Sequence, residues 1–359
     1  MKKKEILIHQ PFLAPYRIPI LNELTKKLKI ILSLDDKKKN KEKINSKITK
    51  IVIKKINFKL FNFRLNFIGL INKKKLKGVI LPSDVKNFTW YRTIFYCKKK
   101  GVPCFIWGHG LFKKNLDNIF IFIFYFIIFK FYEKYLTKYI CYNNLVKKSL
   151  IKIGFNPKKL VVINNTLQKE ILIKKNISSN NKKDILFIGR LRRNNNLDFL
   201  FRTLSLMKLK KINIRLHIFG DGIFYNRLKR LAAELNIDVK FHGEVYDSKK
   251  IKIIADKCFA GVYPGDCGLS VVDFFYYGLP VLVHDDLKFH MGPEPYYVKN
   301  NYNGLLFKRN SEESLLARIK LIYNNKFLIK KLSINSIKTF KNLNKVKMSE
   351  KFEKLLIKN

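Results

Sequence analysis

The chain has 359 residues, of which 47% are hydrophobic and 14% aromatic, and it carries 74 Lys and Arg against 26 Asp and Glu, for a net charge of +48. This apolar content excludes an intrinsically disordered basic protein, and the length favours two domains because single cores stop growing near about 250–300 residues. The positive charge is compatible with a nucleic acid, a membrane surface or a phosphorylated substrate as partner. It could also reflect only the codon bias of an A/T-rich genome, since 62 of the cations are Lys.

The first half of the chain alternates short apolar runs with helical patterns, which is typical of a parallel sheet covered by helices. Its start is basic, but the apolar run that follows stops at His9, so we expect no secretory signal peptide. The predicted strands are residues 5–9, 30–34, 51–53, 79–81, 103–107, 139–142 and 161–163. The predicted helices are residues 18–28, 90–99, 118–135 and 144–153.

One run in this half, residues 119–129, is strongly apolar. A helix needs about 20 such residues to span a bilayer, so we expect no transmembrane segment here. Two interpretations fit the run: a buried helix, or a helix lying in the membrane interface. In the second interpretation the lysines around the run face the lipid headgroups, and they are Lys113, Lys114, Lys130, Lys134 and Lys138.

A polar, Lys-rich stretch at residues 167–183 predicts a linker between two domains. A second α/β series follows it, with predicted strands at residues 184–189, 214–219, 239–242, 260–263 and 280–283. Its predicted helices are residues 197–207, 225–235, 248–256, 269–277 and 312–324. We therefore predict an α/β protein with two Rossmann-like, doubly wound domains, residues 1–166 and 184–335, and a C-terminal helix, residues 336–359, that packs back on the first domain.

The five cysteines are scattered, odd in number and without the spacing of metal ligands. This pattern is typical of a reducing cytosol, and it predicts neither a disulfide framework nor a zinc site. The cysteines are Cys97, Cys104, Cys141, Cys258 and Cys267.

The loop at residues 263–270 joins a predicted strand to a predicted helix and is rich in glycine. Free backbone N–H groups at a helix start bind phosphate oxygens, and glycine lets a ligand approach the backbone. Asp273, one turn into the helix, has a carboxylate that can accept hydrogen bonds from ribose hydroxyls. A plain tight turn before a buried helix is the alternative. The candidate binding residues of the loop are Gly265, Cys267, Gly268, Leu269 and Ser270.

Three arginines, Arg190, Arg192 and Arg193, follow the first predicted strand of the second domain. In a chain that otherwise uses Lys, arginines here favour the planar, bidentate contact that a diphosphate accepts. A solvated basic loop is the alternative. Two further strand-to-helix turns complete this side of the sheet, and their candidate residues are Gly220, Asp221, Gly222, His242, Gly243 and Val245.

Together, the Gly-Arg-Leu opening, the Gly-Asp-Gly turn, the Phe-His-Gly turn and the Gly-Leu…Gly-Leu-Pro-Val block resemble the nucleotide-sugar-binding domain of glycosyltransferase family 4. The resemblance covers residues 184–330 and implies the GT-B fold, in which two domains face each other across a cleft. It also implies a nucleoside-diphosphate-sugar donor, retention of anomeric configuration, and no metal ion or other cofactor. By the same resemblance, Arg190 contacts the diphosphate, Asp273 contacts the ribose, and the turn at His242 borders the base.

Two positions depart from the family pattern. The first Glu of the family's motif is Gly265 here, so Asp266 or backbone groups are expected to recognise the donor sugar. The family's Lys is Asn195 here. Asn195 remains a candidate donor-binding residue, and Arg192 or Arg193 would supply the cation that the Lys provides in the family. The Pro-Gly-x-x-Gly-Leu form of the loop is similar to that of a subset of polysaccharide-building members.

Two residues of the first domain are candidates for the same cleft. Arg17 lies just after the first strand, where it would reach a phosphate; a surface arginine is the alternative. His109 lies between two glycines at the end of another strand, and similar enzymes carry a catalytic-site His on a corresponding loop. We therefore expect His109, Arg190 and Asp266 to be catalytic, although a lone His is more often structural.

These expectations describe a retaining, metal-independent glycosyltransferase that acts on a membrane-associated glycan or glycolipid of the cell-surface polysaccharide or lipopolysaccharide type. A GT-B sugar-nucleotide epimerase or an inactive family member is the nearer alternative, and a basic nucleic-acid-binding protein is a remote one. Residues 1–182 carry a net charge of +32 and residues 183–359 a net charge of +16. This asymmetry predicts a cytoplasmic protein whose first, acceptor-side domain faces anionic lipid at the inner face of the cell membrane.

Overall fold

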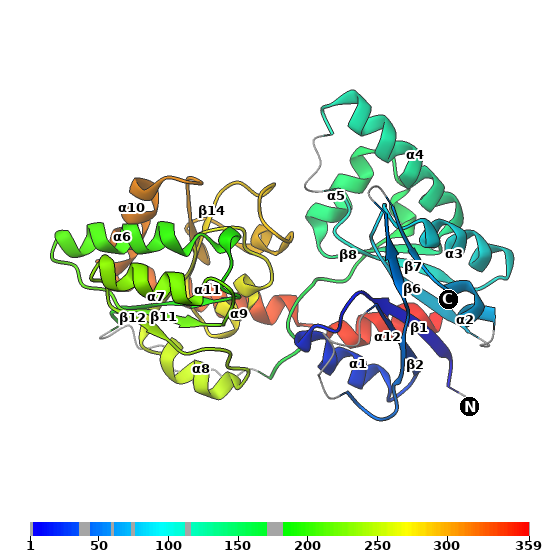
Figure 1. Ribbon diagram of the computed structural model, residues 1–359, viewed down its shortest axis with the longest axis horizontal. Helices are drawn as coiled ribbons and strands as arrows, with labels where there is room; N and C mark the ends of the chain where they lie inside the picture. Colours follow the sequence, from blue (N-terminus) through cyan, green and yellow to red (C-terminus); the bar gives the residue numbers. More distant parts are fainter. Residues whose placement is uncertain are drawn as a thin grey trace. The chain divides into compact units, whose positions relative to one another are not determined.

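The computed structural model describes residues 3–35, 44–58, 61–72, 76–111, 116–170 and 182–358. The chain divides into two compact units: a first unit of Met1–Gln168 with Val346–Asn359, and a second unit of Lys169–Lys345 (Figure 1). Most of the predicted linker, residues 171–181, lies outside the described residues.

The first unit is built on a seven-stranded parallel sheet with the strand order β3-β2-β1-β6-β7-β8-β9. Each predicted strand is present within two residues of its predicted ends, because strands buried on both faces stand out as apolar runs. The chain reverses its order at β1, which pairs with both β2 and β6. The strands are β1 (Glu5–Gln10), β2 (Lys29–Leu34), β3 (Thr49–Val52), β6 (Gly78–Pro82), β7 (Cys104–Gly108), β8 (Lys138–Cys141) and β9 (Leu160–Val162).

All four predicted helices of this unit are present, although α1 ends four residues before its predicted end. A short antiparallel hairpin, β4 and β5, and the helix α2 are additions. The hairpin strands are only partly buried and so do not stand out as apolar runs, and the six residues of α2 are too few for a helical period. The helices are α1 (Ile18–Leu24), α2 (Phe67–Asn72), α3 (Phe88–Lys99), α4 (Ile119–Tyr135) and α5 (Asn144–Lys152), and the hairpin strands are β4 (Lys55–Asn57) and β5 (Asn62–Arg64).

The C-terminal segment differs from its prediction. The sequence predicts one helix over residues 336–359, but the structure has two, α11 (Lys326–Leu343) and α12 (Met348–Lys358). The predicted boundary after residue 335 falls inside α11, which stays in the second unit because its apolar face is buried there. Only α12 belongs to the first unit, where the ring of Phe352 lies 4.9 Å from that of Trp107.

The second unit has a six-stranded parallel sheet with the strand order β12-β11-β10-β13-β14-β15. Its architecture and that of the first unit confirm the predicted α/β class with two doubly wound domains. The strands are β10 (Asp184–Ile188), β11 (Leu216–Phe219), β12 (Val239–Phe241), β13 (Cys258–Tyr263), β14 (Val281–His284) and the unpredicted β15 (Gly304–Phe307). The other helices are α6 (Leu197–Leu209), α7 (Tyr225–Glu234), α8 (Ser248–Ala255), α9 (Ser270–Tyr276) and α10 (Glu312–Tyr323).

Candidate functional site

The sheet order of the second unit brings together the two loops that carry most of the candidate residues. β10 lies between β11 and β13, so the loops after β10 and β13 leave neighbouring strands at the switch point where ligands bind in such sheets. The backbone N–H of Asp266 donates a hydrogen bond of 2.8 Å to the carbonyl oxygen of Asn194 and ties the two loops together. A Cβ atom on Gly265 would stand 2.2 Å from that same oxygen, so this approach requires glycine.

Asn195 lies inside the loop after β10, with its side chain fully buried. Its Nδ2 donates to the carbonyl oxygen of Arg190, and its Oδ1 accepts from Nε of Arg192 at 3.2 Å. The residue that replaces the family's Lys is therefore a positioning residue that shapes the arginine loop from within, and its side chain does not line the surface of the site.

The three candidate arginines lie in the loop after β10, at the switch point of the sheet. Arg190 and Arg193 are exposed, and the half-buried Arg192 also contacts Sδ of Met291. Among the described residues, none of the three forms an ion pair, and the arginines that do are Arg64, Arg202, Arg215 and Arg227. The loop after β10 therefore presents positive charge that no described carboxylate neutralises.

Two glycines let the loops after β10 and β11 pack backbone against backbone. Gly220 has φ +139°, and a Cβ atom there would stand 1.9 Å from the carbonyl oxygen of Gly189. Its N–H donates to the carbonyl oxygen of Gly243 at 2.7 Å, which joins the end of β11 to the end of β12. A Cβ atom on Gly222 would likewise collide with the carbonyl oxygen of Leu191. These glycines hold the predicted face of the sheet together.

Asp221, between these glycines, is exposed and accepts a hydrogen bond of 2.7 Å from the N–H of Gly222. Its carbonyl oxygen accepts from the N–H of Leu191 at 2.9 Å. Its contacts are therefore local to the two turns, and its side chain is open to solvent.

His242 lies at the end of β12 and is held by two aromatic neighbours. Its ring stacks on that of Phe219 with 4.3 Å between centroids, and its Nε2 lies 2.9 Å from Nδ1 of His217. Nε2 of His217 in turn lies 3.0 Å from a carboxylate oxygen of Asp184. Burial, with smaller contributions from His217 and Lys240, lowers the pKa of His242, so its ring is neutral near pH 7. The next residues of this turn, Gly243 and Val245, are half-buried.

The loop after β13 is tied to a segment that the sequence patterns do not single out, residues 290–294. The backbone N–H of Cys267 donates to Nδ1 of His290 at 3.1 Å, and its carbonyl oxygen accepts from the N–H of Met291 at 2.8 Å. Nε2 of His290 donates to the carbonyl oxygen of His284 at 3.0 Å, which fixes the neutral tautomer. Burial raises the pKa of the Cys267 thiol well above its ordinary value, so Cys267 is a structural residue of the loop.

Two carboxylates lie beside this loop, and sequence reasoning finds only one of them. Asp266 is half-buried, with a carboxylate oxygen 3.9 Å from Nε2 of His284. Glu294 is 2% exposed, and its Oε2 lies 3.8 Å from the point that a Cβ atom on Gly268 would occupy. In the sequence, Glu294 stands out only as an acidic residue in a strongly basic chain. This signal is too weak to predict that it lies beside the loop after β13.

Asp273 lies in the first turn of α9, which begins at Ser270 after the N-cap residue Leu269. Its carboxylate is 3.3 Å from Nζ of Lys169, a partner that the sequence does not predict. Burial raises the pKa of the Asp273 carboxyl, and Lys169 opposes that shift. The carboxylate therefore already has a cationic partner where the resemblance implies a ribose contact.

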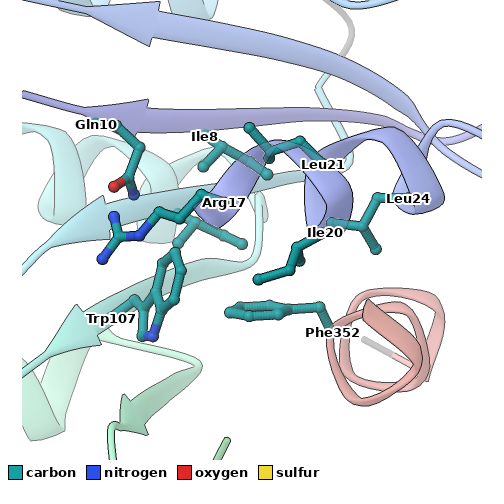
Figure 2. A pocket seen from close by; sticks show the side chains of 9 residues that line it. Ile8, Gln10, Arg17, Ile20, Leu21, Leu24, Trp107 and Phe352 are labelled. Atoms are coloured by element: carbon teal, nitrogen blue, oxygen red, sulfur yellow. The ribbon is translucent and has the colours of Figure 1, made fainter. Parts of the chain in front are cut away.

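In the first unit, Arg17 lies in the short 3-10 helix just after β1 and is held by aromatic side chains. Its guanidinium donates to the hydroxyl of Tyr142 at 2.8 Å and lies 4.2 Å from the centre of the Trp107 ring. Figure 2 shows it beside Gln10 and over the indole of Trp107, in a small, largely apolar pocket that also includes Phe352. Arg17 is therefore an anchored cation and not a freely moving surface residue.

His109 is exposed at the end of β7, and its ring lies 4.6 Å from that of Tyr142. Arg17 and His109 therefore both contact Tyr142, a residue that no sequence motif marks. Close packing requires glycine at both flanking positions. A Cβ atom on Gly108 would stand 2.1 Å from Cβ of Ser83, and one on Gly110 would stand 2.8 Å from Cγ1 of Val146. Together the glycines hold the loop close to the sheet and leave the imidazole exposed.

Comparison with known proteins gives a family match for the second unit. Residues 168–339 match the sequence model of the family "Glycosyl transferases group 1". A curated relative is the GalNAc-α-(1→4)-GalNAc-α-(1→3)-diNAcBac-PP-undecaprenol α-1,4-N-acetyl-D-galactosaminyltransferase of Campylobacter jejuni, 30% identical over 181 residues. The match covers 48% of this chain and 47% of the relative, so the chain spans about half the length of that relative.

Solved structures match the whole fold at low sequence identity. The complex of Anabaena Alr3699/HepE with UDP superimposes with a TM-score of 0.71 at 13% identity, over all of both chains. The apo form of the lipopolysaccharide outer core galactosyltransferase WaaB gives a TM-score of 0.62 at 15% identity, over 98% of this chain and 99% of the other. The chain therefore has the two-domain GT-B fold of glycosyltransferases, and the greater part of its second unit matches the glycosyl transferases group 1 family.

Proposed function

We propose that this protein is a retaining glycosyltransferase that moves a hexosyl or related sugar from a nucleoside-diphosphate sugar to a hydroxyl of a glycan or glycolipid. The observation that carries the proposal is the group of arginines at the switch point, Arg190, Arg192 and Arg193, which lack carboxylate partners among the described residues. A diphosphate supplies the matching negative charge and accepts bidentate contacts from guanidinium groups.

The comparisons support the choice of donor and acceptor class. The Campylobacter relative is named for transfer to an undecaprenol-linked glycan, and the Anabaena structure contains UDP. Uridine diphosphate sugars are therefore the first donors to test, and a lipid-linked glycan of the cell-surface polysaccharide or lipopolysaccharide type is the first acceptor.

The proposed chemistry follows from where charge develops. As the bond between the sugar carbon and the diphosphate breaks, negative charge grows on the diphosphate and positive charge grows on the sugar ring. Preorganised cations such as Arg190 stabilise the first of these in the transition state. Retention follows if the acceptor attacks from the side of the leaving group and the departing phosphate takes the hydroxyl proton. In this scheme arginines neutralise the diphosphate, and the reaction uses no metal ion.

The remaining roles follow from position. Asp266 and Glu294 lie beside the loop where the family has its sugar-binding Glu, so we assign them to the donor sugar. His109 is assigned to the reacting carbon or the acceptor because it is exposed at the carboxyl end of β7. Arg17 is assigned to orienting Tyr142, because Tyr142 contacts both Arg17 and His109.

The deciding experiment replaces Arg190 with Ala and follows consumption of a UDP-sugar in the presence of a lipid-linked glycan. We expect transfer to fall by about 10²–10³-fold, because the substitution removes charge stabilisation in the transition state. The melting temperature should be unchanged, because Arg190 is exposed. Arg230→Ala on α7, also an exposed arginine, is the matched control and should keep its activity.

Full activity in Arg190→Ala would overturn the assignment of the site. NMR of the product tests retention, since an inverted anomeric centre would contradict it. Incubation with donor alone distinguishes transfer from epimerisation, because an epimerase converts the sugar nucleotide without an acceptor.

A further inference from the structure

Seven of the first nine residues of α4 present apolar side chains to solvent. Only Tyr125, Phe129 and Tyr132 of this helix are buried. The largest exposed fractions are 80% for Phe120 and 63% for Ile127. The large apolar side chains of α4 that are at least 36% exposed are Ile119, Phe120, Ile121, Ile123, Phe124, Phe126 and Ile127. The apolar run is thus a helix with one buried side and one exposed apolar side, which neither sequence interpretation describes in full.

The exposed side chains form one continuous face. Successive residues of an α-helix are rotated by about 100°, so positions three, four and seven apart share a side. Phe120, Phe124 and Ile127 satisfy these spacings, while Tyr125 and Phe129 point to the opposite side, into the core. We call the exposed side, centred on Phe120 and Ile127, the α4 face.

Cations continue the α4 face towards the end of the helix. Lys130 and Lys134 lie three and seven residues after Ile127, so they fall on the same side. Lys134 is exposed. Lys130 is partly exposed, is bonded to the carbonyl oxygen of Gly154 and forms an ion pair of 3.3 Å with Glu133. The face therefore changes along its length from apolar to positively charged.

The neighbouring helix α5 adds to this arrangement. Nζ of Lys152, in its last turn, forms an ion pair of 2.9 Å with Asp117, two residues before α4 begins. Ile151 beside it is 40% exposed, and Lys148 one turn earlier is exposed. Lys113 and Lys114, which precede α4 in the sequence, lie outside the described residues.

We propose that the α4 face is a membrane-docking surface, which inserts its apolar side chains into the interface of a bilayer that contains anionic lipids. A helix of this kind buries its apolar face at the boundary of headgroups and acyl chains. Its flanking lysines attract anionic headgroups. None of the helices in the described parts of the chain has the length and apolarity needed to cross a bilayer.

Charge selects lipid over a second copy of this chain as the occupant. The segments of the first unit, residues 1–168 and 346–359, carry 41 cations against 10 acids. Two such units brought face to face would repel each other, whereas an anionic bilayer attracts each of them. This inference does not depend on the proposed reaction, because docking needs neither donor nor acceptor.

The test is flotation of the full chain with vesicles of phosphatidylcholine alone or with about a third phosphatidylglycerol, which contain no glycan. We expect binding to the anionic vesicles at low salt, weakened by added salt, and little binding to the neutral ones. The double variant Phe120→Gln/Ile127→Gln should bind the anionic vesicles roughly tenfold or more weakly, since two large apolar side chains no longer enter the interface.

The matched control is Leu209→Gln/Phe327→Gln, which removes one aliphatic and one Phe side chain that are 79% and 88% exposed in the second unit. It should bind vesicles like the wild type. Equal binding by wild type and the α4 variant, or no preference for anionic vesicles, would overturn the proposal. So would light scattering that shows a wild-type dimer which Phe120→Gln/Ile127→Gln converts to a monomer, because the face would then be a contact between copies. Circular dichroism checks that both variants fold.

Discussion

The backbone N–H of Asp266 donates a 2.8 Å hydrogen bond to the carbonyl oxygen of Asn194, so the two loops of the candidate donor site hold a single joint conformation. Gly265 packs against the same oxygen, at a point where a Cβ atom would stand 2.2 Å away. Position 265 is where the family that this chain resembles has a Glu. The absence of that carboxylate is therefore coupled to the close approach of the two loops, and not to one position alone.

Restoring the carboxylate by Gly265→Glu is expected to damage the site. A side chain there collides with backbone atoms of Asn194 and Asn195, and overpacking of this kind costs about 1–3 kcal/mol. The free energy of unfolding, measured by urea denaturation, should fall by that amount and nucleotide binding should weaken. Gly268→Ala in the same loop is the control, because its added methyl meets its nearest neighbour at 3.6 Å. A Gly265→Glu protein that is as stable as the wild type and turns over donor faster would contradict this account.

Glu294→Gln is expected to weaken binding of a UDP-sugar by roughly tenfold while leaving binding of UDP nearly unchanged. A carboxylate beside Gly268 accepts stronger hydrogen bonds from sugar hydroxyls than an amide does, by about 1–2 kcal/mol. Titration calorimetry with UDP-glucose and with UDP measures both affinities. Glu313→Gln, an exposed acid at the start of α10, is the control. An equal loss for both ligands would mean that Glu294 only supports the loop.

Stability of the first unit should decrease as the pH falls from about 6.5 to about 4. The pKa of His9 is lowered from 6.5 to about 4, mainly by burial; the hydrogen bond with Asp35 opposes this shift, and the charge of Arg64 adds to it. The unfolded chain therefore binds a proton in this range that the folded protein excludes, so the stability present above pH 6.5 is lost on acidification, by about 3 kcal/mol. The lowered pKa of the Asp35 carboxyl keeps that group charged over the same range.

Urea denaturation at a series of pH values checks this prediction, with His9→Gln as the comparison. His284 in the second unit also has a pKa lowered to about 4 by burial, so the wild type and the variant share the pH dependence that comes from that residue. The variant should lose the part that His9 contributes. An NMR titration of His9 in the folded wild type that gives a pKa near 6.5 would refute the interpretation directly.

All five cysteines should be unreactive in the folded protein. Each is buried as a free thiol, and burial raises the pKa of the thiols of Cys141, Cys258 and Cys267. Thiolate is the reacting species, so iodoacetamide at pH 8 should label the native protein negligibly and the urea-unfolded protein fully. Rapid labelling of native Cys267 would show that the loop after β13 opens in solution.

The sequence by itself determined the strands of the first sheet, those of the second sheet except β15, and the loops that carry the candidate residues. Parallel strands buried on both faces stand out as apolar runs, and ligands bind at the carboxyl ends of such strands, so β10 and β13 point to Arg190 and to the loop at Gly265. The short hairpin β4–β5 was not predictable in this way, because its strands are only partly buried and do not form apolar runs. The edge strand β15 is a buried apolar run of four residues that the prediction omits.

Only the tertiary structure decided what several of these residues do. The buried Asn195, the contact between Gly265 and Asn194, and the approach of Glu294 to Gly268 all join segments that sheet order, and not sequence distance, brings together. The α4 face is a second example. The apolar run is compatible with a buried helix or with a helix in the membrane interface, and only packing reveals that Tyr125 and Phe129 fill the core while Phe120 and Ile127 remain in solvent. Local periodicity reports the type of element, whereas exposure depends on which other elements are present to cover it.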